Sequence, residues 1–281
     1  MNGVAVDNPF FLFMHIPKAA GTTLRSIVDL QFGADRVLTY YNQGNRQLLD
    51  NLQYVLRDSD KEFAALIGHF PFGVHENLPC PAPYVTFLRD PVNIAISAFY
   101  ENLKTNLGNF SKADGTPYII GEYVLENPEF FENQQTKSIL GTNDLDAPID
   151  DLLAAAIHNL TTNFIFIGIV EKFAPSLLLL SKQLGWSPCT YKRLNQRRAD
   201  IEVDAPTIKI IAELNEIDRA LYSWAASQLD AKIAQAGSEF EDALKELNFL
   251  LPKDNPEFDH NLAECQFVDT SAPALHRYLD L

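Results

Sequence analysis

The sequence predicts an α/β fold with three layers, in which a mainly parallel central sheet is flanked by helices. Two observations predict it. Short apolar runs recur along the 281 residues, and several of them are followed by a stretch with the spacing of an amphipathic helix. Strands that alternate with helices in this way are typical of parallel sheets covered on both faces. A chain of this length can also bury a sizeable core.

The first strand is expected at residues 9–15, "PFFLFMH", because this short run is apolar and rich in aromatic side chains. A helix is expected over residues 22–32, where apolar side chains recur at helical spacing. A second strand is expected at residues 63–70, "FAALIGHF". The chain is therefore expected to begin with a strand, a turn and a helix, and to return to the sheet soon afterwards.

A third strand is expected to end near Arg89 and to lead directly into a helix. The residues at this junction support the assignment, because Asp90 is a favourable N-cap and Pro91 is preferred at the first helical position. A fourth strand is expected at residues 163–170, "NFIFIGIV". The helix that follows should end at Gly185, since glycine commonly terminates helices.

One long amphipathic helix is expected from Pro206 to about Gln235, because apolar side chains recur there at steps of three and four residues. We expect residues 1–251 to form a single α/β domain. Residues 252–281 are expected to be a C-terminal tail, packed on the domain or partly mobile.

The overall charge limits the partners that the protein can have. With 22 basic and 37 acidic residues the net charge is −15, which argues against a general affinity for nucleic acid or anionic polymers. The three cysteines are widely spaced and lack metal-ligand spacing. Neither a signal peptide nor an apolar stretch of membrane-spanning length is recognised. These features predict a cytoplasmic protein whose anion site, if any, is local.

The stretch "HIPKAAGTTL", residues 15–24, carries the pattern of an anion-binding turn. A glycine-containing turn between a strand and a helix places backbone N–H groups at the positive end of the helix dipole. Lys18 precedes Gly21, which permits close backbone approach, and Thr22 and Thr23 add hydroxyl donors. In the Walker A motif the lysine instead follows its second glycine. The sequence therefore predicts a P-loop-like fold with a variant loop that does not point to a nucleoside triphosphate with Mg²⁺.

At this turn the sequence resembles the sulfotransferases that use 3′-phosphoadenosine 5′-phosphosulfate (PAPS). The similarity is to the branch that contains heparan sulfate 2-O-sulfotransferase and many small bacterial relatives. In that family the "PKxxGTT" turn holds the 5′-phosphosulfate, and Lys18, Gly21, Thr22 and Thr23 match it in register. The resemblance implies that these residues bind PAPS. It adds as ligands the flanking residues of the same turn, which are Ala20 and Leu24.

A second block, "FLRDPVNIAISAFY" at residues 87–100, resembles the family's 3′-phosphate site. Arg89 and Ser97 stand where that family has its arginine and serine. Arginine suits bidentate contact with phosphate, which supports the assignment independently. The alternative is that Arg89 only pairs with a nearby acid and that Ser97 is an ordinary helix serine.

His69 is the candidate catalytic base, because it follows a predicted strand in the "GH" context that the family uses for its base. His75 and Glu76 are alternatives on the same segment. Gln135 and Lys137 resemble a segment near the acceptor site of bacterial relatives, but we interpret them as a solvated helix face.

One basic cluster, "YKRLNQRR" at residues 191–198, stands out in the acidic chain. Relatives place a loop over the nucleotide in the corresponding region. The loose similarity makes Lys192, Arg197 and Arg198 candidate PAPS ligands, and a plain surface patch is the alternative.

The resemblance implies sulfuryl transfer from PAPS to a hydroxyl group, or to an amine, with adenosine 3′,5′-bisphosphate (PAP) as the product. Lys18 would stabilise the leaving phosphate and His69 would take the acceptor's proton, and no metal is required. The acceptor is expected to be a carbohydrate, a glycoconjugate or another small molecule. A P-loop nucleotide kinase or other phosphotransferase and a non-catalytic nucleotide-binding protein are the alternatives. The oligomeric state stays open.

Overall fold

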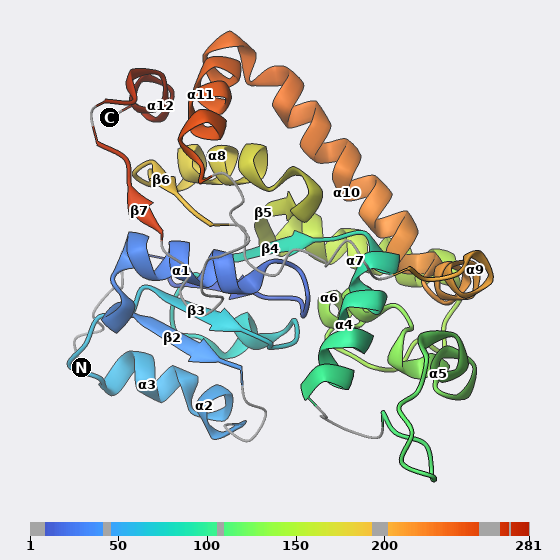
Figure 1. Cartoon of the computed structure of the whole chain (residues 1–281). Coiled ribbons are helices and arrows are strands. Elements are labelled where there is room, and N and C mark those ends of the chain that lie inside the picture. Colours follow the sequence, from blue (N-terminus) through green and yellow to red (C-terminus); the bar gives the residue numbers. More distant parts are fainter. Residues whose placement is uncertain are drawn as a thin grey trace.

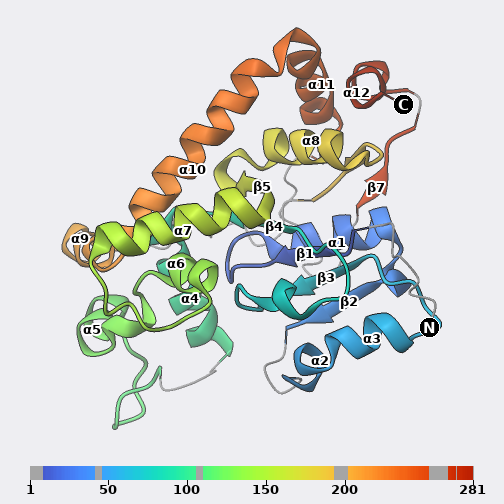
Figure 2. The same cartoon turned by 180° about the vertical axis from the view of Figure 1, so that it is seen from behind.

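The computed structural model describes residues 9–41, 46–105, 110–192, 202–252, 265–269 and 271–280. Figures 1 and 2 show a central sheet with helices on both faces, and α1 is nearer the viewer in Figure 1 whereas α7 is nearer in Figure 2. The predicted α/β fold with a parallel central sheet is confirmed.

The sheet has five parallel strands in the order β2-β3-β1-β4-β5. In chain order they are β1 Phe11–Met14, β2 Val37–Tyr40, β3 Ala65–Gly68, β4 Tyr84–Leu88 and β5 Phe164–Ile169. Four of these strands were expected from the sequence. The edge strand β2 was not, because a run of four residues, of which only Val37 and Tyr40 are buried, carries too little apolar signal.

Helices connect the strands and continue the chain after β5. They are α1 Gly21–Phe32, α2 Arg46–Asp50, α3 Leu52–Asp58, α4 Pro91–Thr105, α5 Ile120–Glu126, α6 Gln134–Leu140, α7 Ile149–Asn163, α8 Phe173–Leu184, α9 Ala205–Leu214, α10 Glu216–Gln235, α11 Gly237–Leu250 and α12 Pro273–Leu279. Short 3₁₀ turns lie at Ala34–Arg36, Val74–Asn77, Pro128–Phe130 and Val170–Lys172. A small antiparallel pair joins β6 Cys189–Thr190 to β7 Gln266–Phe267.

Two helix boundaries confirm the sequence reasoning in detail. The Asp90 side chain accepts a hydrogen bond of 2.8 Å from the backbone N–H of Asn93, so it caps α4, which begins at Pro91. Gly185 ends α8 in the left-handed conformation, and its N–H donates to the Ser181 carbonyl.

The single helix expected from Pro206 to Gln235 is wrong, because the chain forms α9 and α10 with a break at Asn215. The Asn215 side chain donates to the Ile211 carbonyl and accepts from the N–H of Asn133. A side chain that bonds a backbone group of its own helix and one of another segment offers the backbone an alternative to continuing the helix. The apolar periodicity continues across the break and so conceals it.

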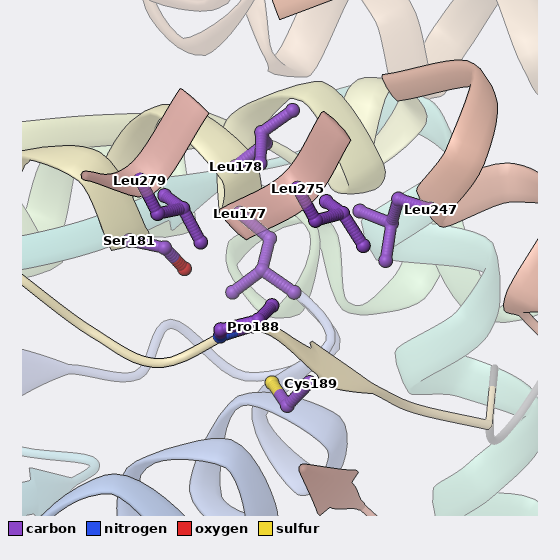
Figure 3. A pocket seen from close by; sticks show the side chains of 8 residues that line it. All are labelled: Leu177, Leu178, Ser181, Pro188, Cys189, Leu247, Leu275 and Leu279. Carbon is purple, nitrogen blue, oxygen red and sulfur yellow. The ribbon is translucent and has the colours of Figure 1, made fainter. Parts of the chain in front are cut away.

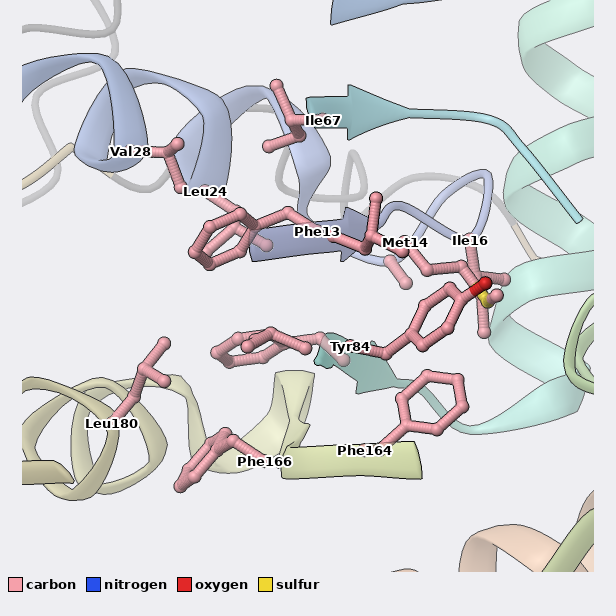
Figure 4. Close-up of a cluster of buried hydrophobic side chains, with 14 of the residues drawn as sticks. Phe13, Met14, Ile16, Leu24, Val28, Ile67, Tyr84, Phe164, Phe166 and Leu180 are labelled. Carbon is pink, nitrogen blue, oxygen red and sulfur yellow. The ribbon is translucent and has the colours of Figure 1, made fainter. Parts of the chain in front are cut away.

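The main core lies between the sheet, α1 and α8 (Figure 4). Phe13 of β1 and Tyr84 of β4 are fully buried. Phe13 lies toward Leu24 and Val28 of α1, whereas the Tyr84 ring lies beside that of Phe164, with ring centroids 4.8 Å apart. Each such side chain contributes about 1.5–3 kcal/mol by leaving water. This core holds the strands in place and so fixes the positions of the loops at their carboxyl ends.

The C-terminal segment packs on the body of the protein through α12. Its Leu275 and Leu279 join a cluster with residues of α8 and α11 (Figure 3). The gap that remains between these helices has a volume of about 10 Å³, which is at the lower limit for one water molecule. It is therefore a packing gap and not a ligand site.

Among the helices of the described residues, none combines the length and apolar character that a membrane span requires. The expected compartment stays a prediction.

Candidate active site

The segments that follow four neighbouring strands meet at the carboxyl edge of the sheet. The turn of residues 15–20 follows β1, Tyr41 follows β2, His69 follows β3 and Arg89 follows β4. In open parallel sheets this edge is the usual place for a ligand. The predicted site residues after three separate strands are thus brought to one edge of the molecule.

The turn before α1 has an unusual backbone. Lys18 and Ala20 both adopt left-handed φ values, 67° and 58°, which cost roughly 1–2 kcal/mol each in non-glycine residues. Ala20 is followed by the helical Gly21, and such an alternation turns successive N–H groups toward one point. The N–H groups of Gly21, Thr22 and Thr23 have no acceptor among the described residues. The turn therefore presents several donors to an anion.

Gly21 is required for a reason that the sequence did not indicate. A methyl group added to its Cα would lie 1.8 Å from Cε1 and Nε2 of His15. The space beside this glycine is thus taken by the His15 imidazole ring. The expectation that Gly21 lets a ligand approach the backbone stays a prediction, and the contact with His15 gives a second reason for glycine at this position.

Leu24 lies apart from the other residues predicted in the turn. Its side chain is buried in the core, and its N–H donates to the Ala20 carbonyl at 3.0 Å. Its contribution is therefore to the packing of α1 under the turn.

The positive charge of Lys18 is only partly compensated by nearby acidic groups. Burial lowers its pKa, Glu101 of α4 opposes that shift from 4.0 Å, and the positive charge of Arg89 adds to it. A lowered lysine pKa means that the surroundings disfavour the ammonium form. A bound anion would remove this imbalance, so the electrostatics agree with the backbone geometry.

Arg89 is held from two sides. Its Nη1 donates to the carbonyl of Lys18 at 2.8 Å, which ties the end of β4 to the turn. Its backbone N–H donates to Oε1 of Gln135, and its carbonyl accepts from Nε2 of the same side chain, both at 3.0 Å. Gln135 is fully buried, so its interpretation as part of a solvated helix face is wrong.

Behind Gln135 stands Asp218 of α10. Its carboxylate accepts from the N–H of Gln135 at 2.9 Å and from the N–H and hydroxyl of Thr136 at 2.7 and 2.6 Å. It thereby supplies acceptors to the otherwise unpaired N–H groups at the start of α6. Burial raises the pKa of Asp218, and these hydrogen bonds oppose the shift. Lys137, the other polar candidate on α6, is paired with Glu132 at 3.3 Å.

His69 lies in contact with a second histidine that sequence reasoning left without a role. Nε2 of His69 is 3.1 Å from Nδ1 of His15, and the ring of Tyr41 packs edge-on against both imidazoles. Burial, His69 and Lys18 lower the pKa of His15 to about 3, and burial and Lys18 also lower that of His69. His69 is therefore neutral at pH 7. If Nε2 of His69 donates to Nδ1 of His15, Nδ1 of His69 is the nitrogen left to accept a proton.

The alternative bases lie elsewhere on the segment after β3. His75 packs against Phe72, and both its N–H and its Nδ1 lie within hydrogen-bond distance of the Tyr84 hydroxyl, at 3.2 and 3.1 Å. Glu76 is exposed on the same 3₁₀ turn. These contacts give His75 a structural role, and His69 is the one of the three beside the turn.

Of the remaining predicted ligands, the structure describes Ser97 and Lys192. Ser97 is half-buried in α4, about two turns from its start. The Thr23 hydroxyl donates to the Lys192 carbonyl at 3.4 Å, so this part of the chain passes over the first turn of α1. Arg197 and Arg198 lie outside the described residues.

Replacing Gly21 with alanine should destabilise the protein through the contact with His15. We expect the Gly21→Ala variant to lose about 1–3 kcal/mol of unfolding free energy, the range for overpacked sites. In a His15→Ala background the same change should cost clearly less, because the ring is gone. Urea denaturation of the four proteins of this double-mutant cycle measures the coupling, and equal costs in both backgrounds would contradict the contact.

Acidification should destabilise the protein through His15. Its pKa is about 3 in the folded protein and near 6.5 in the unfolded chain, so the unfolded chain binds the proton first. Stability should therefore fall as the pH drops from 6.5 toward 3, by at most about 1.4 kcal/mol per pH unit for this group. Urea denaturation at pH 7, 6 and 5 should give a smaller pH dependence for His15→Gln than for the wild type, and equal slopes would refute the assignment.

Comparisons with known proteins indicate a family for this chain. The family model described as galactose-3-O-sulfotransferase matches residues 2–248. Two curated relatives, both named galactose-3-O-sulfotransferase 3, come from Bos taurus and Homo sapiens. Each is 28% identical, over 176 and 177 residues respectively, which is 57% of this chain. The matched part spans only 40% of the length of each relative.

A crystal structure of mouse sulfotransferase SULT7A1 complexed with PAP is also similar, at 14% identity and a TM-score of 0.36. It covers 74% of this chain and 65% of the mouse chain. The family model covers most of the sequence, and on that ground the resemblance to sulfotransferases is confirmed: this chain belongs to the galactose-3-O-sulfotransferase family.

Proposed function

We propose that this protein transfers a sulfuryl group from PAPS to a hydroxyl group of a sugar, with a galactoside as the first acceptor to test. Its family supports this substrate class. The observation that carries the proposal is that the anion-binding turn, Arg89 and a neutral histidine lie at one edge of the sheet. Each of these parts has a place in the reaction.

The residues of the turn fit the 5′-phosphosulfate end of the donor. The unpaired N–H groups of Gly21, Thr22 and Thr23 would bind its oxygens, and the ammonium of Lys18 would neutralise its charge. Arg89 and Ser97 would hold the 3′-phosphate, and Lys192 would lie over the nucleotide. PAPS supplies the sulfuryl group and leaves as PAP.

The chemistry divides between two groups of this chain. Nδ1 of His69 takes the proton of the acceptor hydroxyl, and the oxygen of that hydroxyl forms the new bond to sulfur. The bond between sulfur and the phosphate oxygen breaks, and its electron pair stays on that oxygen. Lys18 and the N–H groups of the turn are positioned in advance for this growing negative charge. The lowered pKa of His69 keeps the imidazole neutral and ready to act as a base.

Calorimetric titration should show tight binding of PAP and weaker binding of ADP, with or without Mg²⁺. In Arg89→Ala we expect the affinity for PAP to fall about 10- to 100-fold, the usual effect of losing a charge-assisted contact. ADP lacks the 3′-phosphate, so its affinity should fall less. An exposed arginine variant, Arg57→Ala, serves as the control.

This design separates the two roles that Arg89 can have. If Arg89 only braces the turn through the Lys18 carbonyl, PAP and ADP should lose affinity equally. Preference of the wild type for ADP with Mg²⁺ would refute the proposal and move the protein to the phosphotransferases.

Lys18→Ala and His69→Ala should both reduce turnover more than donor affinity. We expect His69→Ala to lower kcat by about 10²–10⁴ with PAP affinity nearly unchanged, which is the range for a lost general base. Lys18→Ala should lower kcat more than it weakens PAP binding, because its charge is used most as the leaving group departs. Steady-state rates and titrations on both variants test this, with the exposed His158→Ala and Lys209→Ala as matched controls.

If His69→Ala keeps its turnover, the base is another residue. If Lys18→Ala loses binding and turnover in equal proportion, the lysine acts only in binding.

A further inference from the structure

An open groove has helices α2 and α3 on one side and the segment that follows β3 on the other. Its volume is about 470 Å³, within the range of sites for small ligands. The lining residues come from these two parts of the chain and are Leu49, Asp50, Gln53, Pro71, Phe72, Gly73, Val74, Asn77 and Leu78.

The groove begins next to the candidate base. Pro71, which lines it, is two residues after His69, so the two Cα atoms are at most about 7 Å apart. Figures 1 and 2 show α2 and α3 beside β2, at the opposite end of the sheet from β5. The groove and His69 therefore share the β2–β3 side of the site.

The strand order places the donor residues on the other side of His69. Lys18 and the turn follow the central strand β1, and Arg89 follows β4. His69 follows β3, and the walls of the groove follow β3 and β2. An acceptor that attacks sulfur in line with the departing phosphate must approach from the side opposite the donor, and that side contains the groove.

The lining suits a neutral sugar. Asp50, Gln53 and Asn77 are exposed polar residues that can bond hydroxyl groups, and they lie among small apolar surfaces such as Val74 and Leu78. Among the described residues that line the groove none is lysine or arginine, and one is an acid. This composition favours an uncharged ligand over a sulfated or carboxylated one.

The wall formed by residues 71–78 is held in place by the body of the protein. The N–H of Phe72 donates to the Ser138 carbonyl of α6 at 3.1 Å. The contacts between His75 and the buried Tyr84 fix the 3₁₀ turn that follows. A groove with such a wall is formed before the ligand arrives, which reduces the ordering cost of binding.

We propose that this groove binds the acceptor as a neutral sugar, with the side chains of Asp50, Gln53 and Asn77 bonding its hydroxyl groups. The assignment rests on the proposed function, because it places the reacting hydroxyl between the groove and Nδ1 of His69.

The test uses lactose as the acceptor and Gln53→Ala and Asn77→Ala as the variants. Both side chains are exposed, so the fold should tolerate their loss. Each variant should raise the KM for lactose between about twofold and about tenfold, the effect of losing one hydrogen bond, with kcat within about twofold. PAP affinity measured by calorimetry should not change. Gln228→Ala and Asn248→Ala, which alter exposed residues of α10 and α11, should leave all three values unchanged.

Charge selectivity provides a second readout. The wild type should use lactose better than 6′-sulfated lactose, and Asp50→Asn should narrow that difference. An unchanged lactose KM in both alanine variants, with transfer by the wild type intact, overturns the groove assignment and leaves the proposed function standing.

If the wild type binds PAP but transfers nothing to lactose, the proposed function fails separately. Saturation-transfer NMR of lactose with the PAP-bound protein then tests whether the groove binds the sugar. Lactose signals that are weaker in Gln53→Ala and Asn77→Ala than in the wild type support the groove assignment. The assignment is overturned if the wild type gives no signal, or if the variants give the same signal as the wild type.

Discussion

The pairing of β1 with both β3 and β4 is the constraint on which the rest of the site depends. Met14 lies opposite Gly68 on one side and Thr86 on the other, so β1 and β3 end at the same level and β4 continues for two more residues, to Leu88. The His15 N–H bonds the Gly68 carbonyl, and the Thr86 hydroxyl bonds the Met14 carbonyl. The turn, the histidine pair and Arg89 can meet because this central register allows no slip without moving core side chains to the wrong face.

A buried polar chain connects this edge to the C-terminal half of the protein. Asp218 on α10 holds the start of α6, Gln135 of α6 holds the backbone of Arg89, and the Arg89 side chain holds the carbonyl of Lys18. Each link pairs groups that would be costly to leave unsatisfied in the interior. The position of the anion-binding turn therefore depends on a helix about 200 residues further along the chain.

The electrostatics of the site oppose those of the whole molecule. The chain carries a net charge of −15, yet its carboxyl edge combines Lys18, Arg89 and the unpaired N–H groups of α1. Burial disfavours the charged forms of Lys18, His15 and His69 alike. A local site of this kind suits the anionic donor proposed for it, and the described lining of the groove contains no lysine or arginine that would favour an anionic acceptor.

Local signals in the sequence determined the elements and the chemistry at their junctions. Aromatic runs marked four strands, Asp90 and Gly185 marked helix ends, and "HIPKAAGTTL" marked the turn, because each feature acts within a few residues of itself. The tertiary structure alone decided what Gly21 accommodates, why Gln135 is buried and where α9 ends. Those outcomes depend on partners 6 to 83 positions away, such as His15 beside Gly21 and Asp218 beside Gln135, and periodicity carries no information about them. The groove beside His69 belongs to the same class, since it exists only where the helices after β2 pack beside the segment after β3.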